Sequence, residues 1–350
     1  MIKILHSGDW HLDSPLQGRT PEQAAVLRRE LLKIPGKIAA LCKEEACDLV
    51  LLSGDLFDGA YTQESYRTVY DALQGMDVPV FITPGNHDYI YPGSPYEGET
   101  WPENVHIFKK QQIEWVDIPS LDLRIYGAGF QSMDCPGLLE GFRAEGPAVG
   151  VFHGDPTQVN SPYNPVTRNQ VAQSGLKYLA LGHVHKGDSF TAGDTLCAWP
   201  GCPMGRGWDE EGEKGVLLVT LDERVRTRFV PLNTPQFFDL TVDISKGLSS
   251  VLPAVPGDDF YRITLNGEAE TVDLNTMRAE FGDFPNLVLR DQTTRPVDIW
   301  AGAGEDNFEG MYFGLLQDAL ADADEDMREK ILLAAKLSRQ LLDGQEVVLP

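Results

Sequence analysis

Residues 49–58 read LVLLSGDLFD. An apolar run is followed by a serine, a glycine and then two aspartates, Asp55 and Asp58. A short apolar run bounded by a turn predicts a buried β-strand. The same arrangement recurs along the chain, where apolar runs precede motifs of acidic, amide or imidazole side chains. These runs are residues 2–5, 49–52, 78–82, 149–152 and 178–181. Side chains just beyond strand ends converge at one edge of a sheet, which predicts an α/β fold with its site there.

The five motifs that follow these runs contain five of the seven histidines of the chain. They are Asp9-Trp10-His11, Gly54-Asp55, Gly85-Asn86-His87-Asp88, His153-Gly154 and Gly182-His183-Val184-His185. Each motif alone is common as a cap, a turn or a strand end. Their concentration after predicted strands favours a metal site instead. The other two histidines, His6 and His106, have no such context and are predicted to be structural.

The chemistry of these side chains predicts a site for two divalent metal ions. A carboxylate has two oxygens and can bridge ions about 3.5–4 Å apart, and Asp55 is the candidate for this role. The other ligands divide into two sets. These are Asp9, His11 and His185 for one ion, and Asn86, His153 and His183 for the other. Nitrogen and oxygen donors without a thiolate favour Mn, Fe or Zn over Ca or Mg.

Further side chains are candidates for catalysis and substrate binding. His87 is adjacent to a ligand but is not counted as one, so we predict that it is the general acid that protonates a leaving oxygen. Asp88 could orient His87, or it could cap the turn that follows. Tyr163, Arg206 and Trp208 are candidate substrate contacts, because an arginine can bind a phosphate and an aromatic ring can stack on a base. Packing of the two aromatic rings is the alternative.

The apolar pattern also predicts the organisation of the chain. Helices are expected at 21–46, with a break or restart at Pro35, and at 62–75. Shorter strands are expected at 105–108, 122–127, 195–199, 215–221 and 225–230. A smaller unit follows, with strands at 237–244, 260–265 and 286–290 and helices at 272–281, 308–321 and 325–342. The last helix has one broad apolar side that suits packing on its own domain or on a partner.

The motif pattern resembles that of the calcineurin-like metallophosphoesterase superfamily. The phrases LHSGDWHLDSP, LVLLSGDLFD, VFITPGNHD and YLALGHVHK are similar to those of the SbcD nuclease subunit of bacterial double-strand-break repair complexes. Within that group, HLDSP, YNPVT and PGCPMGRGWDEEGEKG resemble the YhaO-type exonuclease branch. The resemblance covers residues 1–232. The chain departs from it at Asp58, where some relatives have a second catalytic histidine after GDLF.

This resemblance implies a fold of two packed mixed β-sheets flanked by helices, an α/β/β/α sandwich, in residues 1–235. It also implies a small α+β capping domain at 236–297 that guides DNA, followed by a C-terminal helical segment at 298–350. The implied activity is that of a Mn-dependent DNA exonuclease or endonuclease in DNA repair and recombination. An SMC-like coiled-coil ATPase is the implied partner. Whether the protein also forms a homodimer stays open.

The composition is typical of a globular chain with one large domain and a smaller unit, with 350 residues of which 42% are hydrophobic and 23% charged. No apolar stretch approaches the roughly 20 residues that cross a bilayer. The first predicted strand begins at residue 2, which leaves no room for a signal peptide. Five cysteines without a CxxC pair indicate reduced thiols. We therefore expect a cytoplasmic protein without a membrane segment.

The net charge of −24 opposes DNA binding, because proteins that bind DNA usually present a basic surface. Residues 233–350 hold 22 acidic and 9 basic side chains, a net of −13, which leaves −11 for residues 1–232. Three functions therefore stay open. The first is a DNA nuclease whose partner supplies much of the affinity, and the second is a phosphodiesterase or phosphatase for a small nucleotide or metabolite. The third, a non-catalytic interaction subunit, is disfavoured by the complete ligand set.

Overall fold

The computed structural model describes residues 1–296 and 298–344. The first half of the chain provides most of the strands of a six-stranded mixed sheet. Its strands are β1 (Ile2–Ser7), β2 (Leu49–Leu52), β3 (Val80–Ile82), β4 (Val105–Ile107), β11 (Gly215–Leu221) and β12 (Arg226–Pro231). Their order is β12-β11-β1-β2-β3-β4. β1 to β4 are parallel, whereas β11 pairs antiparallel with β1 and β12.

A second six-stranded sheet holds the remaining strands of the region up to residue 235. They are β5 (Glu114–Ile118), β6 (Leu123–Ala128), β7 (Ala148–His153), β8 (Tyr178–Gly182), β9 (Lys186–Ala192) and β10 (Thr195–Gly201). Their order is β5-β6-β7-β8-β10-β9. The four central strands are parallel, and the two edge strands β5 and β9 are antiparallel to their neighbours. Both sheets are therefore mixed, as expected.

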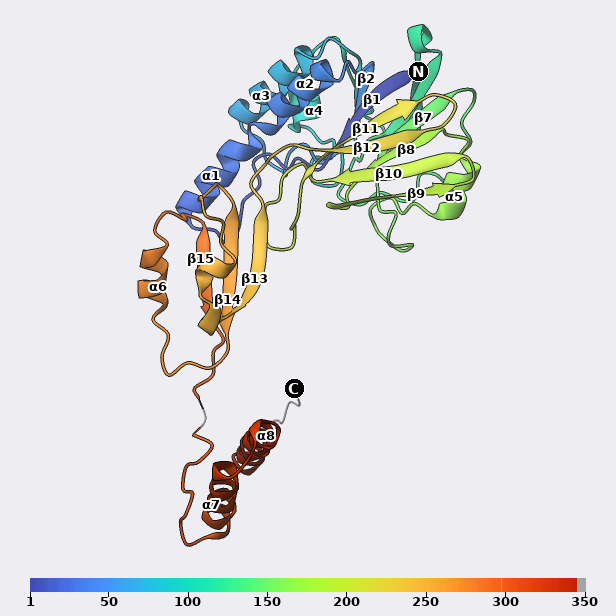
Figure 1. The fold of residues 1–350 in the computed structure, drawn as a ribbon. Helices are drawn as coiled ribbons and strands as arrows, with labels where there is room; N and C mark the ends of the chain where they lie inside the picture. Colours follow the sequence, from blue (N-terminus) through green and yellow to red (C-terminus); the bar gives the residue numbers. More distant parts are fainter. Residues whose placement is uncertain (297, 345–350) are drawn as a thin grey trace. The chain divides into compact units, whose positions relative to one another are not determined.

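The two sheets pack face to face around one apolar core. Ile4 and Leu51 of the first sheet lie in this core with Val149 and Val151 of the second. Since successive side chains of a strand point to opposite faces, the neighbouring residues on these strands face outward and form two further cores under the helices. The resulting layers, helices over each of two packed sheets, confirm the predicted α/β/β/α sandwich (Figure 1).

Helices cover the outer face of each sheet. α1 (Pro21–Leu31), α2 (Ile34–Glu44) and α3 (Gln63–Gln74) pack on the first sheet, and the short α5 (Arg168–Gln173) packs on the second. The predicted restart at Pro35 is confirmed, because this proline lies in the first turn of α2, where its missing amide hydrogen costs no helical hydrogen bond. α4 (Pro95–Gly98) is a single turn in the loop after the Asn86 motif.

Beyond residue 235, the described residues contain a three-stranded sheet, three α-helices and two 3-10 helices (Ile244–Lys246 and Leu248–Ser250). The sheet has the order β13-β14-β15, with β13 (Phe237–Asp243), β14 (Phe260–Asn266) and β15 (Leu287–Asp291). The α-helices are α6 (Leu274–Glu280), α7 (Phe308–Ala321) and α8 (Glu325–Leu342). The chain divides into two compact units, the first with residues 1–240, 255–262 and 283–288, the second with the remainder. The three-part division expected from the sequence stays a prediction.

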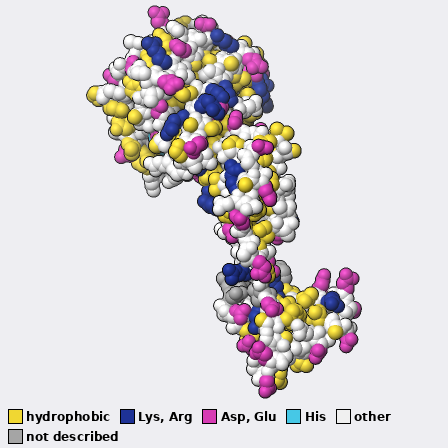
Figure 2. All heavy atoms as spheres, turned by 90° about the vertical axis from the view of Figure 1, so that its left-hand side faces the viewer, with side chains coloured by type: hydrophobic (Ala, Val, Ile, Leu, Met, Phe, Trp, Pro, Cys, Tyr) yellow, Lys and Arg dark blue, Asp and Glu magenta, His cyan; other side chains and the backbone are white. Residues whose placement is uncertain are grey.

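The last two helices pair within the second unit. Phe313 of α7 and Ile331 and Ala335 of α8 are buried, and the hydroxyls of Tyr312 and Ser338 lie 2.9 Å apart. The hydrophobic side chains that these helices leave exposed are Phe308, Met311, Leu315, Met327, Leu332, Leu333, Leu341 and Leu342. Figure 2 shows such side chains gathered on this part of the protein. In the described part of the chain, no helix has the length and apolar character that a bilayer crossing requires.

Candidate metal centre

The predicted ligands lie where the carboxyl ends of strands from both sheets meet. Asp9 and Asp55 follow the parallel strands β1 and β2, whereas His153 ends β7 and His183 follows β8. The backbone amide of Asp9 donates to the carbonyl of Gly54 (2.9 Å). The amide of His183 donates to the carboxylate of Asp9 (2.9 Å), across 174 residues of sequence. The fold therefore brings these loops together at one place.

Asp9, His11 and His185 form one group, with ligand atoms within 4.8 Å of one another. The Nε2 atoms of His11 and His185 lie 3.0 Å apart. The Nδ1 atom of His185 lies 2.6 Å from a carboxylate oxygen of Glu210. Since a carboxylate accepts hydrogen bonds, Nδ1 donates, and Nε2 of the neutral imidazole presents a lone pair toward His11. This is the orientation that a metal ligand requires.

Asn86, His153 and His183 form a second group. The Oδ1 atom of Asn86 lies 2.8 Å from Nε2 of His153 and 3.1 Å from Nδ1 of His183. Nδ1 of His153 lies 2.9 Å from the carbonyl oxygen of Ser53 and therefore donates to it, which leaves a lone pair on Nε2. An amide oxygen and an imidazole lone pair that face each other fit a shared cation.

Asp55 lies between the two groups. Its Oδ2 atom is 3.4 Å from Nε2 of His153 and 3.8 Å from Nε2 of His11. Its other oxygen, Oδ1, accepts from the backbone amide of His87 (2.9 Å), which fixes the carboxylate. The seven side chains supply two carboxylates, one amide oxygen and four imidazoles. This donor set fits two divalent cations with Asp55 between them, although the assignment of each ligand stays a prediction.

Burial favours the neutral form of three of the four imidazoles, whereas in His185 the hydrogen bond with Glu210 outweighs burial and raises the pKa. Burial lowers the pKa of His11 and His153 and lowers the pKa of His183 to about 3. Neutral imidazoles are the form that binds metal ions. Burial also raises the pKa of Asp9, and raises that of Asp55 to about 6. A bound divalent cation would oppose this second effect, because its charge favours the ionised carboxylate.

The local backbone is adapted to the site. Asp9, His11, Asp55 and His183 have positive φ angles of 53°, 48°, 51° and 98°. Such conformations cost about 1–3 kcal/mol each in residues other than glycine, and they persist where the surrounding structure enforces them. Gly85 is required for a different reason, because a Cβ atom there would lie 2.8 Å from the ring of His153. The sequence motifs therefore provide the backbone conformations and the close packing of the loops at the site, in addition to the predicted ligands.

His87 lies beside the ligand groups and is 45% exposed. Its Nδ1 atom lies 2.6 Å from Oδ1 of Asp58, and its ring centroid is 4.7 Å from that of His11. The hydrogen bond with Asp58 raises the pKa of His87 despite its partial burial. The carboxylate also orients the ring, because it fixes which nitrogen carries the proton toward it. Asp58, the position at which the chain departs from the pattern of the resemblance, is thus the partner of His87.

Asp88 holds the loops of the site rather than the imidazole of His87. Its fully buried carboxylate accepts from the backbone amides of Gly85 (2.7 Å) and Leu56 (2.7 Å) and from the hydroxyl of Tyr96 (2.6 Å). These contacts join the loop after β2 to the Asn86 motif. They go to residues before Asp88 and to Tyr96 rather than to the turn that directly follows it, so this role differs from both roles expected from the sequence.

Two of the predicted substrate contacts lie at the site. Arg206 donates to Glu210 (3.0 Å), and its guanidinium lies 3.5 Å from Asp58 and 3.3 Å from Nδ1 of His185. The ring centroid of Tyr163 is 4.8 Å from that of His183. Both residues are therefore placed where a substrate could meet the ligand groups.

Trp208 lies elsewhere. The guanidinium carbons of Arg19 and Arg262 lie over its ring, 5.2 Å and 4.8 Å from the centroid. The ring also meets that of Phe237 edge to face, with centroids 5.1 Å apart. Since the ring is already covered by cationic and aromatic neighbours, the geometry favours the packing alternative over stacking on a base.

Glu210 is a residue of the site that was not predicted from the sequence. It is one of three successive acidic residues, Asp209, Glu210 and Glu211, and it alone of the three is buried. Burial opposes ionisation, but hydrogen bonds from His185 and Arg206 lower the pKa of Glu210 to about 2. No signal in the local sequence separates it from its neighbours, because the contacts depend on the fold.

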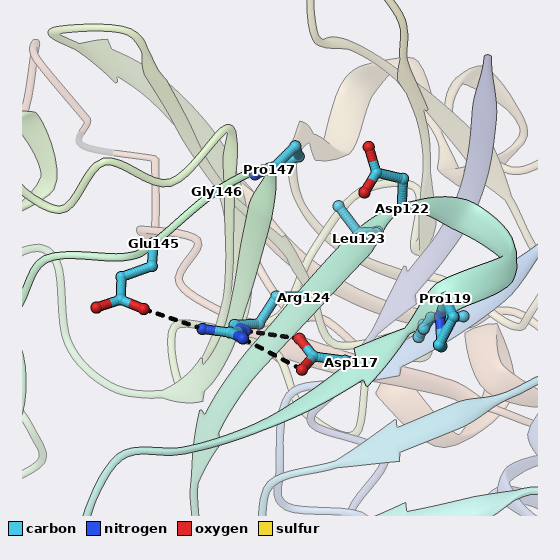
Figure 3. Close-up of a pocket in the computed structure, with 9 residues that line it drawn as sticks. Asp117, Pro119, Asp122, Leu123, Arg124, Glu145, Gly146 and Pro147 are labelled. Carbon is cyan, nitrogen blue, oxygen red and sulfur yellow. Dashed lines mark hydrogen bonds and ion pairs between the residues drawn. The ribbon is translucent and has the colours of Figure 1, made fainter.

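A cavity of about 360 Å³ near residues 117–124 and 145–147 contains none of the predicted site residues. Arg124 is its cationic side chain, and it is already paired with Asp117 (2.6 Å) and Glu145 (3.4 Å), as Figure 3 shows. Ala148, the residue opposite Arg124 on the neighbouring strand, begins the strand that His153 ends. The cavity is therefore remote from the ligand groups, and its cation is neutralised.

Comparison with known proteins finds relatives in sequence and in structure. The chain is 32% identical over 238 residues to the uncharacterized metallophosphoesterase YhaO of Bacillus subtilis, covering 62% of this chain and 57% of that protein. It is 23% identical over 265 residues to the SbcD component of nuclease SbcCD from the same organism, covering 62% and 66%. It thus spans about three fifths of the length of these relatives. A dimetal phosphatase from Danio rerio aligns with a TM-score of 0.47 and 12% identity, over 67% of this chain and 97% of that one.

A model of the calcineurin-like phosphoesterase family matches residues 2–187, which include every predicted ligand. The matched region begins with β1 and ends just after the motif that holds His183 and His185. Its family is metal-dependent, in agreement with the donor set described above. The chain therefore belongs to the calcineurin-like phosphoesterases, a family of metal-dependent phosphoester hydrolases.

Proposed function

We propose that this protein is a two-metal phosphodiesterase that cleaves DNA, as an exonuclease or endonuclease. The observation that carries the proposal is the position of Asp55, whose Oδ2 atom lies within 4 Å of imidazole nitrogens from both ligand groups. A carboxylate shared by two groups of nitrogen and oxygen donors is the arrangement expected for a two-metal hydrolytic site. We propose Mn as the metal, with Fe and Zn as alternatives that the same donors accept.

Bound at this centre, two divalent ions would supply a hydroxide at neutral pH and neutralise the charge that grows on the phosphoryl oxygens. The protein's own contribution is to hold the reacting groups. Asp58 orients the ring of His87, so that Nε2 is the nitrogen free to deliver a proton to the leaving oxygen. Arg206 and Tyr163, at the edge of the same site, are the proposed contacts of the substrate.

The similarity to the SbcD component of a nuclease supports DNA as the substrate. The second unit, which lies entirely beyond the region matched by the family model, supports a function beyond hydrolysis of a small metabolite. The net charge of −24 weakens any affinity for DNA that the chain has alone. We therefore propose that an SMC-like coiled-coil ATPase binds this chain and contributes much of the affinity for DNA.

Helix α7 supplies the proposed docking surface for that partner. Phe308, Met311 and Leu315 are 81%, 59% and 70% exposed, and their spacing of three and four residues places them on one side of the helix. An apolar stripe of this kind suits docking against another helix. On α8, Ile331 packs inside the hairpin whereas Leu341 is exposed, so only part of the apolar side expected from the sequence is free.

A phosphodiesterase or phosphatase for a small nucleotide or metabolite is the second candidate. The acidic charge favours it, because a small substrate does not need an extended basic surface. The discriminating experiment measures hydrolysis of bis(p-nitrophenyl) phosphate and of linear duplex DNA by the purified chain with Mn²⁺, Fe²⁺ or Zn²⁺. Cleavage of both supports a nuclease. Cleavage of the small diester alone, also after addition of the ATPase, favours the second candidate, and cleavage of neither contradicts an enzymatic role.

Removal of residues 305–350 should separate hydrolysis from assembly. We expect the truncated protein to keep its turnover of bis(p-nitrophenyl) phosphate within about twofold, because every predicted ligand lies in the first unit. We expect it to lose association with the ATPase, measured by size-exclusion chromatography of the mixture, and to process long DNA more slowly in that mixture. Association is expected to depend on burial of the apolar stripe, which contributes roughly 25 cal/mol of free energy per Å² of apolar surface removed from water.

A matched pair of variants keeps this prediction independent of folding. Phe308→Ser, Met311→Ser and Leu315→Ser together should weaken association, whereas Gln317→Ser, on an exposed polar position of the opposite side of the same helix, should not. Thermal melting of each variant monitors stability. A truncated chain that is active and still binds the ATPase would exclude these helices as the docking surface. A truncated chain that loses small-diester turnover would show that they stabilise the protein instead.

A further inference from the structure

The imidazoles that present Nε2 to the metal centre differ in the partner of their other nitrogen. Nδ1 of His11 is buried, lies 3.8 Å from a carboxylate oxygen of Asp58 and has no hydrogen-bond partner among the described residues. For His153 the partner is the backbone carbonyl of Ser53, at 2.9 Å from Nδ1. For His185 it is the carboxylate of Glu210, at 2.6 Å from Nδ1. The nearest carboxylate of His183, that of Asp155, is 4.0 Å from Nε2. Among the histidines of the two ligand groups, His185 therefore has the closest contact with a charged partner.

The carboxylate of Glu210 is itself fixed on both oxygens. Oε2 accepts from the backbone amide of Arg206 (2.7 Å), and Oε1 accepts from the guanidinium of the same residue (3.0 Å). The side chain of Glu210 is 8% exposed and that of Arg206 is 15% exposed. A carboxylate held in this way cannot rotate away from His185 without losing two hydrogen bonds from Arg206.

We propose that Glu210 is a positioning residue of the metal centre, which fixes the tautomer and the ring orientation of His185, with Arg206 fixing Glu210 in turn. A carboxylate on the far nitrogen of a ligating histidine sets which nitrogen is free to bind metal and increases its basicity. Glu210 lies outside the region matched by the family model, in the loop between β10 and β11. The inference rests on the ligand role proposed above for His185.

Arg206 extends this network toward the proposed general acid. Its guanidinium lies 3.5 Å from Oδ2 of Asp58, and Asp58 holds the ring of His87 at 2.6 Å. Arg206 thus contacts both Glu210, which is hydrogen-bonded to the predicted ligand His185, and Asp58, which is hydrogen-bonded to His87. Loss of Glu210 should free Arg206 and weaken both arrangements, so its effects are expected on metal binding first and on turnover second.

The test compares Glu210→Gln and Glu210→Ala with Glu213→Gln, an exposed acidic residue three positions along the same loop. Mn²⁺ binding to the full chain is measured by isothermal titration calorimetry, and stoichiometry by mass spectrometry after dialysis. We expect Glu210→Ala to bind one of the two ions about 10–100-fold more weakly, Glu210→Gln to lie between it and the parent, and Glu213→Gln to match the parent. Thermal melting without metal monitors folding.

A spectroscopic measurement separates positioning from a merely structural role. In ¹⁵N-labelled protein, the ring of His185 should change from the Nδ1–H tautomer toward a mixture in Glu210→Ala, and only partly in Glu210→Gln, which can still accept a hydrogen bond. Unchanged Mn²⁺ affinity and an unchanged tautomer in a folded Glu210→Ala protein would overturn the inference. His185→Ala is the reference: if it too binds two ions with parental affinity, the ligand assignment fails, and the failure lies in the proposed function.

Discussion

Asp55→Asn should remove both metal ions and reduce phosphodiester hydrolysis to background. Oδ2 of Asp55 lies within 4 Å of an imidazole nitrogen from each ligand group, so it is the one side chain expected to contact both ions. An asparagine keeps the shape but loses the negative charge and one of the two oxygens, so it cannot bridge two cations. Metal content by mass spectrometry after dialysis against Mn²⁺, together with turnover of bis(p-nitrophenyl) phosphate, tests this expectation.

Stability measurements distinguish loss of metal from loss of the fold. Burial raises the pKa of Asp55 to about 6, so near neutral pH the ionised carboxylate destabilises the folded metal-free protein relative to a neutral side chain. Asp55→Asn should therefore melt no lower than the parent when both lack metal. Only the parent should gain stability when Mn²⁺ is added, because only it binds the ions.

Asp77→Asn is the matched control, since Asp77 has a similar positive φ of 57° against 51° for Asp55 but is exposed and remote from the ligand groups. It should keep parental metal content and activity. A content near two ions per chain in Asp55→Asn would contradict the bridging role. A content near one ion would assign Asp55 to a single ligand group and would leave the rest of the proposed donor set standing.

The ligand motifs could be predicted because they follow strands that are buried on both faces. β2 and β8 consist of near-continuous apolar residues, and this pattern gives both the strand and the place where it ends. Once the strands are known to be parallel, the side chains after them must lie at one edge. Helices α7 and α8 were predicted with their observed ends, because each begins at a polar cap, Asn307 and Asp324.

The strands that the sequence did not reveal are the edges of the second sheet. β9 reads KGDSFTA and is largely exposed, so it has no apolar periodicity, and β5 alternates exposed and half-buried residues. Their pairing depends on a neighbouring strand rather than on local pattern.

The contacts between side chains in the site also depend on the fold rather than on the local sequence. Asp88 follows His87 directly in the sequence, whereas Asp58 lies 29 residues before it. Only the fold shows that Asp58 is the carboxylate that contacts the ring of His87.

His87→Ala should lower turnover by about 10²–10⁴ while both metal ions stay bound. In the structure, the Nδ1 atom of His87 is engaged by Asp58, whereas the imidazoles that contact the amide oxygen of Asn86 are those of His153 and His183. The loss should be smaller for p-nitrophenyl diesters than for alkyl diesters, because p-nitrophenolate leaves without protonation. Turnover of both diesters and metal content together test this expectation.

Two further variants make the assignment of the general acid specific. Asp58→Asn should reduce turnover less than His87→Ala, because asparagine keeps the shape beside the ring but orients it less strongly. His106→Ala, on the exposed side of β4, should leave both turnover and metal content unchanged. If His87→Ala instead loses one ion, His87 is a ligand, as its place in a group with His11 and Asp58 would then indicate. If its loss of turnover is equal for both diesters, His87 positions the substrate and the proton comes from another group.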